Sequence, residues 1–235
     1  MDIFFPMAGQ GARFGHKFKP FLTIGEETFI EAAMRPFRAF ADRVARFVFV
    51  YLEAQEAQFD VRRRLESMFT GLPVHTVALA TPTRGPAETI ARATERVGAG
   101  GAAFVCDCDH SLDVQPLFER AAAGGYDAIL PVWPLAENEL ASWSVAMVED
   151  GHVRAIAEKR MPTVRRGTAM GVIGCYGFRD MERVTSRAVA SEATNFSDVL
   201  GPMLEEGGVV EAVRIEHARF FGDPERLAKE TSSPL

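Results

Sequence analysis

Glycines and two cations stand close together near the start of the chain. Residues 6–15 read PMAGQGARFG, and a Lys-Pro pair begins at Lys19. Gly9 and Gly11 allow a tight backbone turn whose N–H groups can face an anion. The planar guanidinium of Arg13 suits two phosphate oxygens, and the ammonium of Lys19 is a compact point charge. The pattern Gly-x-Gly-x-Arg-x-Gly followed by Lys-Pro therefore predicts a phosphate-binding loop.

Two better-known glycine loops do not fit these residues. A dinucleotide fingerprint needs a third glycine where the chain has Phe14, and no acidic residue follows about 20 positions later at a strand end. The Gly-Lys-Ser/Thr ending of the NTPase phosphate loop is also missing from the sequence. The alternative to a phosphate-binding loop is an ordinary strand-to-helix turn with surface cations.

Two aspartates follow a buried apolar run later in the chain. In FVCDCDH, residues 104–110, Asp107 and Asp109 come at the end of a strand expected over residues 102–108. Open α/β sheets bind ligands at this end, and strand alternation turns both carboxylates to one face. Carboxylate oxygens suit Mg²⁺, which keeps several waters and bridges to substrate phosphates. We expect Asp109, just beyond the strand, to be the stronger ligand; the alternative is that the aspartates cap the next turn.

A carboxylate and an ammonium adjoin at Glu158 and Lys159, at the end of a strand expected over residues 153–158. Such a pair can hold a hydroxyl or an amine together with a phosphate. The alternative is an exposed salt-bridging edge of a hairpin. The five histidines have no helical metal-ligand spacing, and the sequence has no Gly-x-Ser-x-Gly elbow. We therefore expect neither a catalytic zinc nor a serine hydrolase.

Alternating strands and helices must position these residues in the first half of the chain. Strands are expected over residues 2–6, 44–52, 74–79 and 102–108, and helical patterns over 29–40, 54–68, 86–97 and 114–123. Thr28 and Glu31 have capping-box spacing at the start of the first helix. This order predicts a parallel sheet with helices on both faces.

The pattern changes in the second half. Strands are expected over residues 128–132, 142–148, 153–158, 168–178 and 209–215, and helices over 199–205 and 224–231. Residues 149–151, Glu-Asp-Gly, fit a hairpin turn. We predict an α/β fold with a Rossmann-like mixed, mainly parallel sheet. One domain over residues 1–235 would combine a nucleotide-binding half (1–125) with an acceptor-binding half (126–235).

Composition limits the possible partners. Hydrophobic residues make up 47% of the 235 residues, enough for a sizeable core. The formal net charge of −6 argues against nucleic acid as a partner. The longest apolar stretches are strand-length, and the first residues lack a basic signal-peptide region, so no membrane partner is expected. The three cysteines are expected to be buried thiols in a reducing cytoplasm.

Taken together, these segments resemble the sugar-nucleotide pyrophosphorylase type of nucleotidyltransferase, a group that includes glucose-1-phosphate thymidylyltransferases and phosphocholine cytidylyltransferases. The resemblance runs nearly from end to end. It covers PMAGQGARFG with KPFLTIGEETFIEAAM, TRGPAETIARA, FVCDCDHSLD, VRAIAEKRMP with GVIGCYGF, and FFGDPERLAKE. The first and fourth segments are the most specific. The resemblance implies the nucleotide-diphospho-sugar transferase fold.

The resemblance also implies roles for individual residues. Arg13 and Lys19 would be catalytic, with Lys19 stabilising charge on the α-phosphate. The nucleotide would be bound by Ala8, Gly9, Gly11, Gly85, Pro86, Thr89 and Asp107, with the base packing on the segment from Gly85. The phosphorylated acceptor would be contacted by Glu158, Lys159 and Asn195. Asp109 would bind Mg²⁺.

Three positions depart from the family pattern. Arg160 stands where the family usually has proline, and residues 222–227, GDPERL, replace the usual closing sequence. Phe220 occupies the position of a second metal-binding aspartate found in many members. The missing carboxylate would have to come from Asp107, Asp223 or Asp198, unless phosphates and water complete the metal shell.

The expected reaction is attack of a phosphomonoester on the α-phosphorus of a nucleoside triphosphate, with pyrophosphate leaving. The attacking phosphate has a second pKa of about 6, so no general base is required. The product would be an activated sugar, small phospho-alcohol or phospho-amine for a surface polymer, and CTP is favoured over other nucleotides. Two alternatives remain: a glycosyltransferase that uses Asp107-x-Asp109, and a nucleotide-binding homologue without turnover. A homo-oligomer is left open.

Overall fold

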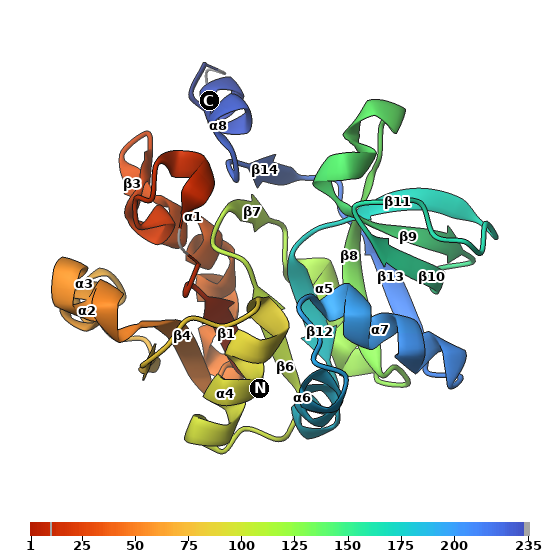
Figure 1. Cartoon of the computed structure of the whole chain (residues 1–235), viewed down its shortest axis with the longest axis horizontal. Coiled ribbons are helices and arrows are strands. Elements are labelled where there is room, and N and C mark those ends of the chain that lie inside the picture. Colours follow the sequence, from red (N-terminus) through yellow and green to blue (C-terminus); the bar gives the residue numbers. More distant parts are fainter. Residues whose placement is uncertain (10, 233–235) are drawn as a thin grey trace. The chain divides into compact units, whose positions relative to one another are not determined.

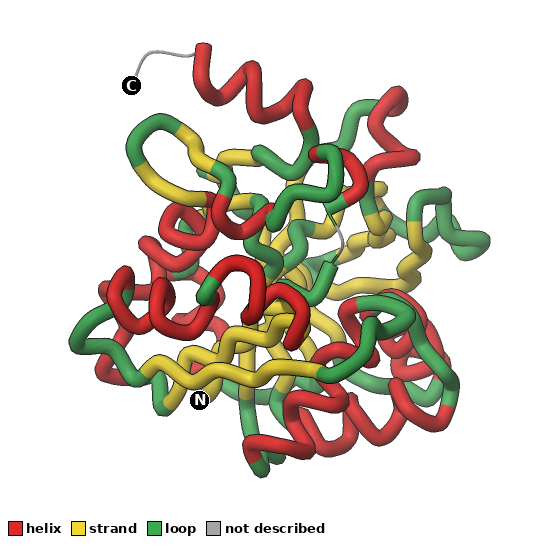
Figure 2. The backbone as a smooth tube through the Cα atoms, turned by 60° about the vertical axis from the view of Figure 1, so that its left-hand side comes forward, coloured by secondary structure: helices red, strands yellow, loops and turns green. Residues whose placement is uncertain are grey.

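The computed structural model describes residues 1–9 and 11–232, which fall into two compact units. Unit 1 is built from Met1–Thr83, Val105–Val114 and His217–Leu235, and unit 2 from Arg84–Phe104 and Gln115–Glu216. Figure 1 labels most of the helices and strands of both units, and Figure 2 colours the helices red and the strands yellow along the backbone. Unit 1 thus takes segments from both halves expected from the sequence, and the assignment of the chain to one domain stays a prediction.

Parallel strands form the centre of unit 1. Strand β1 (Asp2–Pro6) pairs with β4 (Arg46–Leu52), and β4 pairs on its other side with β5 (Val74–Leu79), in both cases in parallel. Strand β6 (Ala103–Cys106), which ends in unit 1, is the other neighbour of β1. Residues 3–5 and 47–50 are completely buried, as expected for a sheet that is covered on both faces.

Short helices and two small two-stranded sheets complete unit 1. The helices are η1 (Ala12–Phe14), η2 (Lys19–Phe21), α1 (Phe29–Met34), η3 (Arg35–Arg43), α2 (Glu53–Phe59), α3 (Val61–Met68) and α8 (Pro224–Ser232). Strand β2 (Thr23–Ile24) pairs with β3 (Glu27–Thr28), and β7 (His110–Leu112) pairs with β14 (Ala218–Phe220), both antiparallel. Neither small sheet was predicted, because strands this short have no readable alternation.

Two expected helices of unit 1 are shorter than predicted. The capping box of α1 is confirmed: the Thr28 hydroxyl accepts from the backbone N–H of Glu31, and the Glu31 carboxylate accepts from that of Thr28. The α-helix nevertheless ends at Met34, because Pro36 has no N–H to continue the i to i−4 ladder. The helix expected over residues 54–68 is also wrong. Asp60 adopts φ 51°, which separates α2 from α3.

Unit 2 contains a mixed sheet. Its strands are β8 (Ala128–Pro134), β9 (Ser144–Glu149), β10 (His152–Glu158), β11 (Thr168–Val172), β12 (Cys175–Phe178) and β13 (Val210–Arg214), in the order β11-β9-β10-β13-β8-β12. β13 runs parallel to β8, and the other characterised pairs are antiparallel. The predicted turn between β9 and β10 is confirmed, with Asp150 and Gly151 both at positive φ.

Helices α4 (Pro86–Val97), α5 (Gln115–Ala123), α6 (Met181–Ala190) and α7 (Phe196–Glu205), with the short η4 (Glu137–Ser142), complete unit 2. Helix α6 was not predicted. The strand expected over residues 168–178 is wrong as a single element. A turn closed by the N–H of Cys175 on the carbonyl of Ile173 interrupts it, so β11 and β12 pair with different parts of β8. No helix among the described residues is long and apolar enough to cross a membrane.

Candidate functional site

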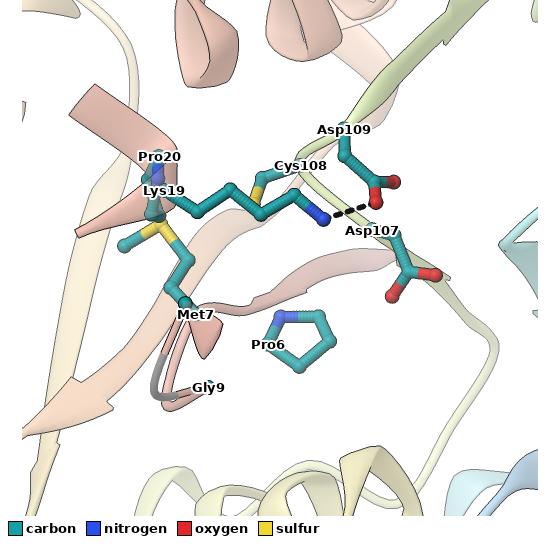
Figure 3. A pocket seen from close by; sticks show the side chains of 9 residues that line it. Pro6, Met7, Gly9, Lys19, Pro20, Asp107, Cys108 and Asp109 are labelled. Carbon is teal, nitrogen blue, oxygen red and sulfur yellow. Dashed lines mark hydrogen bonds and ion pairs between the residues drawn. The ribbon is translucent and has the colours of Figure 1, made fainter. Parts of the chain in front are cut away.

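A cavity of about 190 Å³ opens in unit 1 beside the ends of β1 and β6. Figure 3 shows its lining, which combines the glycine loop, the Lys-Pro pair and the aspartate loop. The lining residues are Pro6, Met7, Gly9, Gly11, Lys19, Pro20, Asp107, Cys108 and Asp109. The cavity therefore brings together two segments that are about 90 residues apart in the sequence, and both of them were predicted to carry chemistry.

The glycine loop has a conformation that depends on Gly11. Gly11 adopts φ 62°, and a Cβ atom there would lie 2.0 Å from the backbone oxygen of Lys17. Its carbonyl oxygen accepts hydrogen bonds from the N–H groups of Phe14 and His16, at 2.9 and 3.0 Å. A side chain at position 11 would force this loop open, because the left-handed conformation and the close approach both require glycine.

The other residues of the glycine loop differ in their exposure and in whether they line the cavity. Gly9 is exposed, and its carbonyl accepts a hydrogen bond from the Gln55 amide at 3.0 Å. Ala8 is buried and does not line the cavity. The side chain of Arg13 is exposed, lies outside the cavity lining, and is paired with none of residues 1–9 and 11–232. Of the two predicted catalytic cations, the structure therefore brings only Lys19 to the aspartates.

Lys19 forms an ion pair with Asp109, through its Nζ atom and the Oδ2 atom. Each side chain is 24% exposed. Burial is the largest influence on Asp109 and opposes its charge, but Lys19 and His110 together outweigh it and hold the pKa of this carboxyl well below its usual range. Burial likewise opposes the charge on Lys19, yet Asp109, with help from Asp107, raises the pKa of the ammonium. Both groups are therefore charged at neutral pH.

The aspartates lie in a loop rather than on a strand. Strand β6 ends at Cys106, so the prediction that alternation along a strand over residues 102–108 aligns the two carboxylates is wrong. The chain leaves the sheet two residues earlier than expected and begins β7 at His110. Both aspartates still line the cavity, as Figure 3 shows. Between them, burial raises the pKa of Cys108 to about 12, which keeps the thiol neutral.

The closing segment of unit 1 packs directly on Asp109. The N–H of Phe221 donates to the backbone oxygen of Asp109 at 3.0 Å, and a Cβ atom on Gly222 would lie 2.6 Å from Asp109 Oδ2. The Nδ1 atom of His110 lies 3.4 Å from Asp109 Oδ1. The buried Nε2 atom of His110 has no hydrogen-bond partner among the described residues. The sequence reasoning did not identify Gly222, although the closing motif that contains it was the available signal.

The structure separates the three candidates for the missing carboxylate. Asp223 accepts from the N–H of Arg226 at 2.9 Å at the start of α8. Asp198 accepts from two backbone N–H groups that precede α7. Only Asp107 lines the cavity with Asp109. The described residues contain no group of three or more His, Cys, Asp or Glu that could hold a metal. Two carboxylates still fit Mg²⁺, because this ion takes its remaining ligands from phosphates and water.

The base-contacting segment predicted from the sequence lies at the start of α4, in unit 2. A Cβ atom on Gly85 would lie 2.5 Å from the backbone oxygen of Thr194, and this oxygen accepts from the N–H of Ala87 at 3.1 Å. Pro86 is the first residue of the helix. The hydroxyl of Thr89, which is 3% exposed, donates to the Gly85 carbonyl at 3.0 Å. Close packing against Thr194 therefore explains why residue 85 is a glycine.

The predicted acceptor-binding pair lies at the end of β10, also in unit 2. The Nζ atom of Lys159 is 3.6 Å from Oε1 of Glu158. The hydroxyls of Ser144 and Ser197 both donate to the other carboxylate oxygen, Oε2. Asn195 precedes α7 as its N-cap, two residues before Ser197. Sequence reasoning did not single out either serine; for Ser197, the nearby predicted Asn195 was the only signal.

Comparisons with known proteins point to one fold. A family model described as MobA-like NTP transferase domain matches residues 6–168. A nucleoside-diphosphate-sugar pyrophosphorylase from Vibrio cholerae RC9 is similar in structure, with a TM-score of 0.79 and 20% identity over 98% of this chain and 100% of that chain. A UTP-bound UGPase from Acinetobacter baumannii has a TM-score of 0.77 and 17% identity, over 98% of this chain and 91% of that chain. An inositol-1-phosphate CTP transferase from T. maritima has a TM-score of 0.75 and 14% identity, over 100% of this chain and 97% of that chain.

No curated protein matches the chain. At these identities the structural likeness shows the fold alone. It confirms the predicted α/β class and the nucleotide-diphospho-sugar transferase fold with its mixed sheet.

Proposed function

This chain belongs to the family of MobA-like NTP transferase domains and is a nucleotidyltransferase, and we propose that it joins a nucleoside triphosphate to a small phosphorylated acceptor. Pyrophosphate is the second product. The observation that carries this proposal is the ion pair of Lys19 with Asp109 inside a glycine-lined cavity. The cavity brings a cation, two carboxylates and the backbone of two glycines together beside the ends of parallel strands.

The proposed roles follow from charge. A phosphomonoester dianion and a triphosphate repel each other, so catalysis consists mainly of positioning and charge neutralisation. The N–H groups around Gly9 and Gly11, which follow Ala8, bind the triphosphate, and Arg13 reaches it from the exposed side of the loop. Lys19 neutralises charge that develops on the α-phosphate. Attack then proceeds in line from the acceptor phosphate, and no side chain has to remove a proton.

A divalent cation belongs to the proposal. Asp109 and Asp107 would hold Mg²⁺, which supplies positive charge to the triphosphate. In that arrangement Lys19 no longer has to balance Asp109 and can turn its ammonium to the phosphates. The Asp109 carboxylate is ionised before the nucleotide arrives, because Lys19 and His110 keep its pKa low.

The second unit supplies the remaining roles in the proposal. The base packs on Gly85 and Pro86, and the buried Thr89 supports this segment through its hydrogen bond to the Gly85 carbonyl. We favour a pyrimidine, with CTP first. The descriptions of two similar structures, a UTP-bound protein and a CTP transferase, support this choice. Glu158, Lys159 and Asn195 bind the phosphorylated acceptor. We place the reaction in the cytoplasm, where the three buried free thiols fit, and its product in surface-polymer synthesis.

Pyrophosphate release tests this proposal. The protein is incubated with Mg²⁺, each of the four common NTPs, and a panel of sugar phosphates, inositol 1-phosphate, phosphocholine and phosphoethanolamine. We expect pyrophosphate with at least one pair, and none after chelation. Release of a nucleoside diphosphate from a nucleotide sugar would favour a glycosyltransferase instead. Nucleotide binding without pyrophosphate from any pair would indicate a homologue that has lost turnover.

A further inference from the structure

The two oxygens of the Glu158 carboxylate have different partners. Oε2 accepts hydrogen bonds from Ser144 Oγ and from Ser197 Oγ, the latter at 3.3 Å. Oε1 lies 3.6 Å from Lys159 Nζ. The Glu158 side chain is 27% exposed, whereas Ser197 is only 5% exposed. One carboxylate oxygen is thus occupied by the protein interior, and the other faces a cation at the surface.

Both hydroxyls come from regular elements that fix their positions. Ser144 begins β9 and lies directly opposite Glu158 in the β9–β10 ladder, while β11 pairs with its other side at Val172. Ser197 lies in the first turn of α7. A free glutamate rotates about three side-chain bonds, but two donors on one oxygen select a single orientation. The serines therefore aim Oε1 in a defined direction.

Lys159 is brought to the same side by an unusual backbone. Successive residues of a strand point to opposite faces, so a regular continuation of β10 would carry Lys159 away from Glu158. Lys159 instead adopts φ 50°, in the left-handed region that non-glycine residues rarely enter. Its N–H donates to the backbone oxygen of Trp143 at 3.0 Å, which anchors the turn. Strain of this kind is common at functional sites.

We propose that Ser144 and Ser197 are positioning residues that reserve Oε1 of Glu158 for the acceptor, a role that rests on the proposed function. Oε1 accepts a hydrogen bond from an acceptor hydroxyl, and the neighbouring Lys159 ammonium binds the acceptor phosphate. The ammonium already neutralises the carboxylate, and Arg160 adds a second exposed cation. A quaternary or primary ammonium on the acceptor would meet like charge, so the site selects neutral phosphorylated polyols over phosphocholine and phosphoethanolamine.

Binding of glucose 1-phosphate, measured by calorimetry without nucleotide, gives the first test. Hydrogen bonds to charged groups contribute about 1.5–3 kcal/mol, which corresponds to a loss of about 10- to 100-fold in affinity when both are removed. We expect this loss in Ser144→Ala/Ser197→Ala, with NTP affinity unchanged within about twofold. Ser144→Thr keeps the hydroxyl and should bind within about threefold of wild type. Unchanged binding in the double variant would overturn the proposal.

A double-mutant cycle separates positioning from a purely structural role. Glu158→Gln removes the charge that the hydroxyls orient, so adding Ser197→Ala to it should cost little further affinity. If Ser197→Ala weakens binding equally with and without Glu158, the serine acts through folding and the proposal is wrong.

The choice of acceptor gives an independent readout. Glucose 1-phosphate or inositol 1-phosphate should bind at least about tenfold more tightly than phosphocholine, as expected from a like-charge cost of about 1.4 kcal/mol. Equal binding, or no binding of either polyol phosphate, would contradict the proposal. Pyrophosphate is measured in parallel. Selective polyol binding that depends on the serines, without pyrophosphate from any NTP, would refute the proposed function while the positioning role stands.

Discussion

Replacing Lys19 by methionine removes one charge of the pair at the centre of the cavity and keeps the length of the side chain. Two unit charges about 4 Å apart attract by about 4 kcal/mol at an effective dielectric constant of about 20. Desolvation and the 24% exposure of both side chains offset part of this attraction. We therefore expect Lys19→Met to lower the free energy of unfolding by about 2 kcal/mol, because Asp109 is left charged and partly buried.

Urea unfolding with EDTA present measures this loss, and a double-mutant cycle assigns it to the pair. Asp109→Asn should cost a similar amount, and Lys19→Met/Asp109→Asn no more than either single variant. Lys17→Met removes the same charge from the same loop at an exposed position and should change stability by less than about 0.5 kcal/mol. Strictly additive losses at positions 19 and 109 would refute the reasoning.

The same variant tests the proposed chemistry. If Lys19 neutralises charge on the α-phosphate, its removal should reduce pyrophosphate release at least about 100-fold, the usual range for the loss of one charged or hydrogen-bonding stabiliser. Mg²⁺ should restore more stability to Lys19→Met than to wild type, since the ion then balances Asp109 without a competing ammonium. Near-normal turnover would show that the cation has no part in the reaction.

Three further predictions concern other positions. Gly222→Ala places a Cβ 2.6 Å from Asp109 Oδ2 and should reduce turnover at least about tenfold with an unchanged circular dichroism spectrum. Gly11→Ala should lower the free energy of unfolding by about 3 kcal/mol and Gly15→Ala by only about 1 kcal/mol, since both have φ above 60° but only Gly11 meets a backbone oxygen. Equal losses would remove the steric argument. The backbone N–H of Arg84, with the guanidinium groups of Arg84 and Arg92, lowers the pKa of Glu88 to about 2. The contribution of Glu88 to stability, about 1–2 kcal/mol after screening, is therefore present above pH 4.5 and is lost as the pH falls toward 2. Urea unfolding should show Glu88→Gln less stable than wild type at pH 7 and nearly equal near pH 2.5.

Local patterns in the sequence determined the elements and the segments that carry chemistry. The capping box of Thr28 and Glu31 and the turn at Asp150 and Gly151 involve neighbours within three residues, so their geometry follows from short-range sterics and hydrogen bonds. The apolar runs predicted the buried parallel strands of unit 1. The same kind of reading missed the break at Asp60, because no residue type there forbids a continuous helix.

The contacts within each candidate site were decided by the tertiary structure, because they join residues that are far apart in the sequence. The pairing of Lys19 with Asp109 and the packing of Gly222 on that carboxylate join segments about 90 and 110 residues apart in the sequence, and only the folded path brings them together. The partner of Glu158 depended on a single irregularity. The β9–β10 register shifts between Val153 and Ala155, and this bulge places Ser144 opposite Glu158; an unbroken hairpin would have placed it opposite Ala157. One extra residue in a bulge reverses the face of every side chain beyond it. The pattern of residue types does not show at which position of the strand the bulge forms.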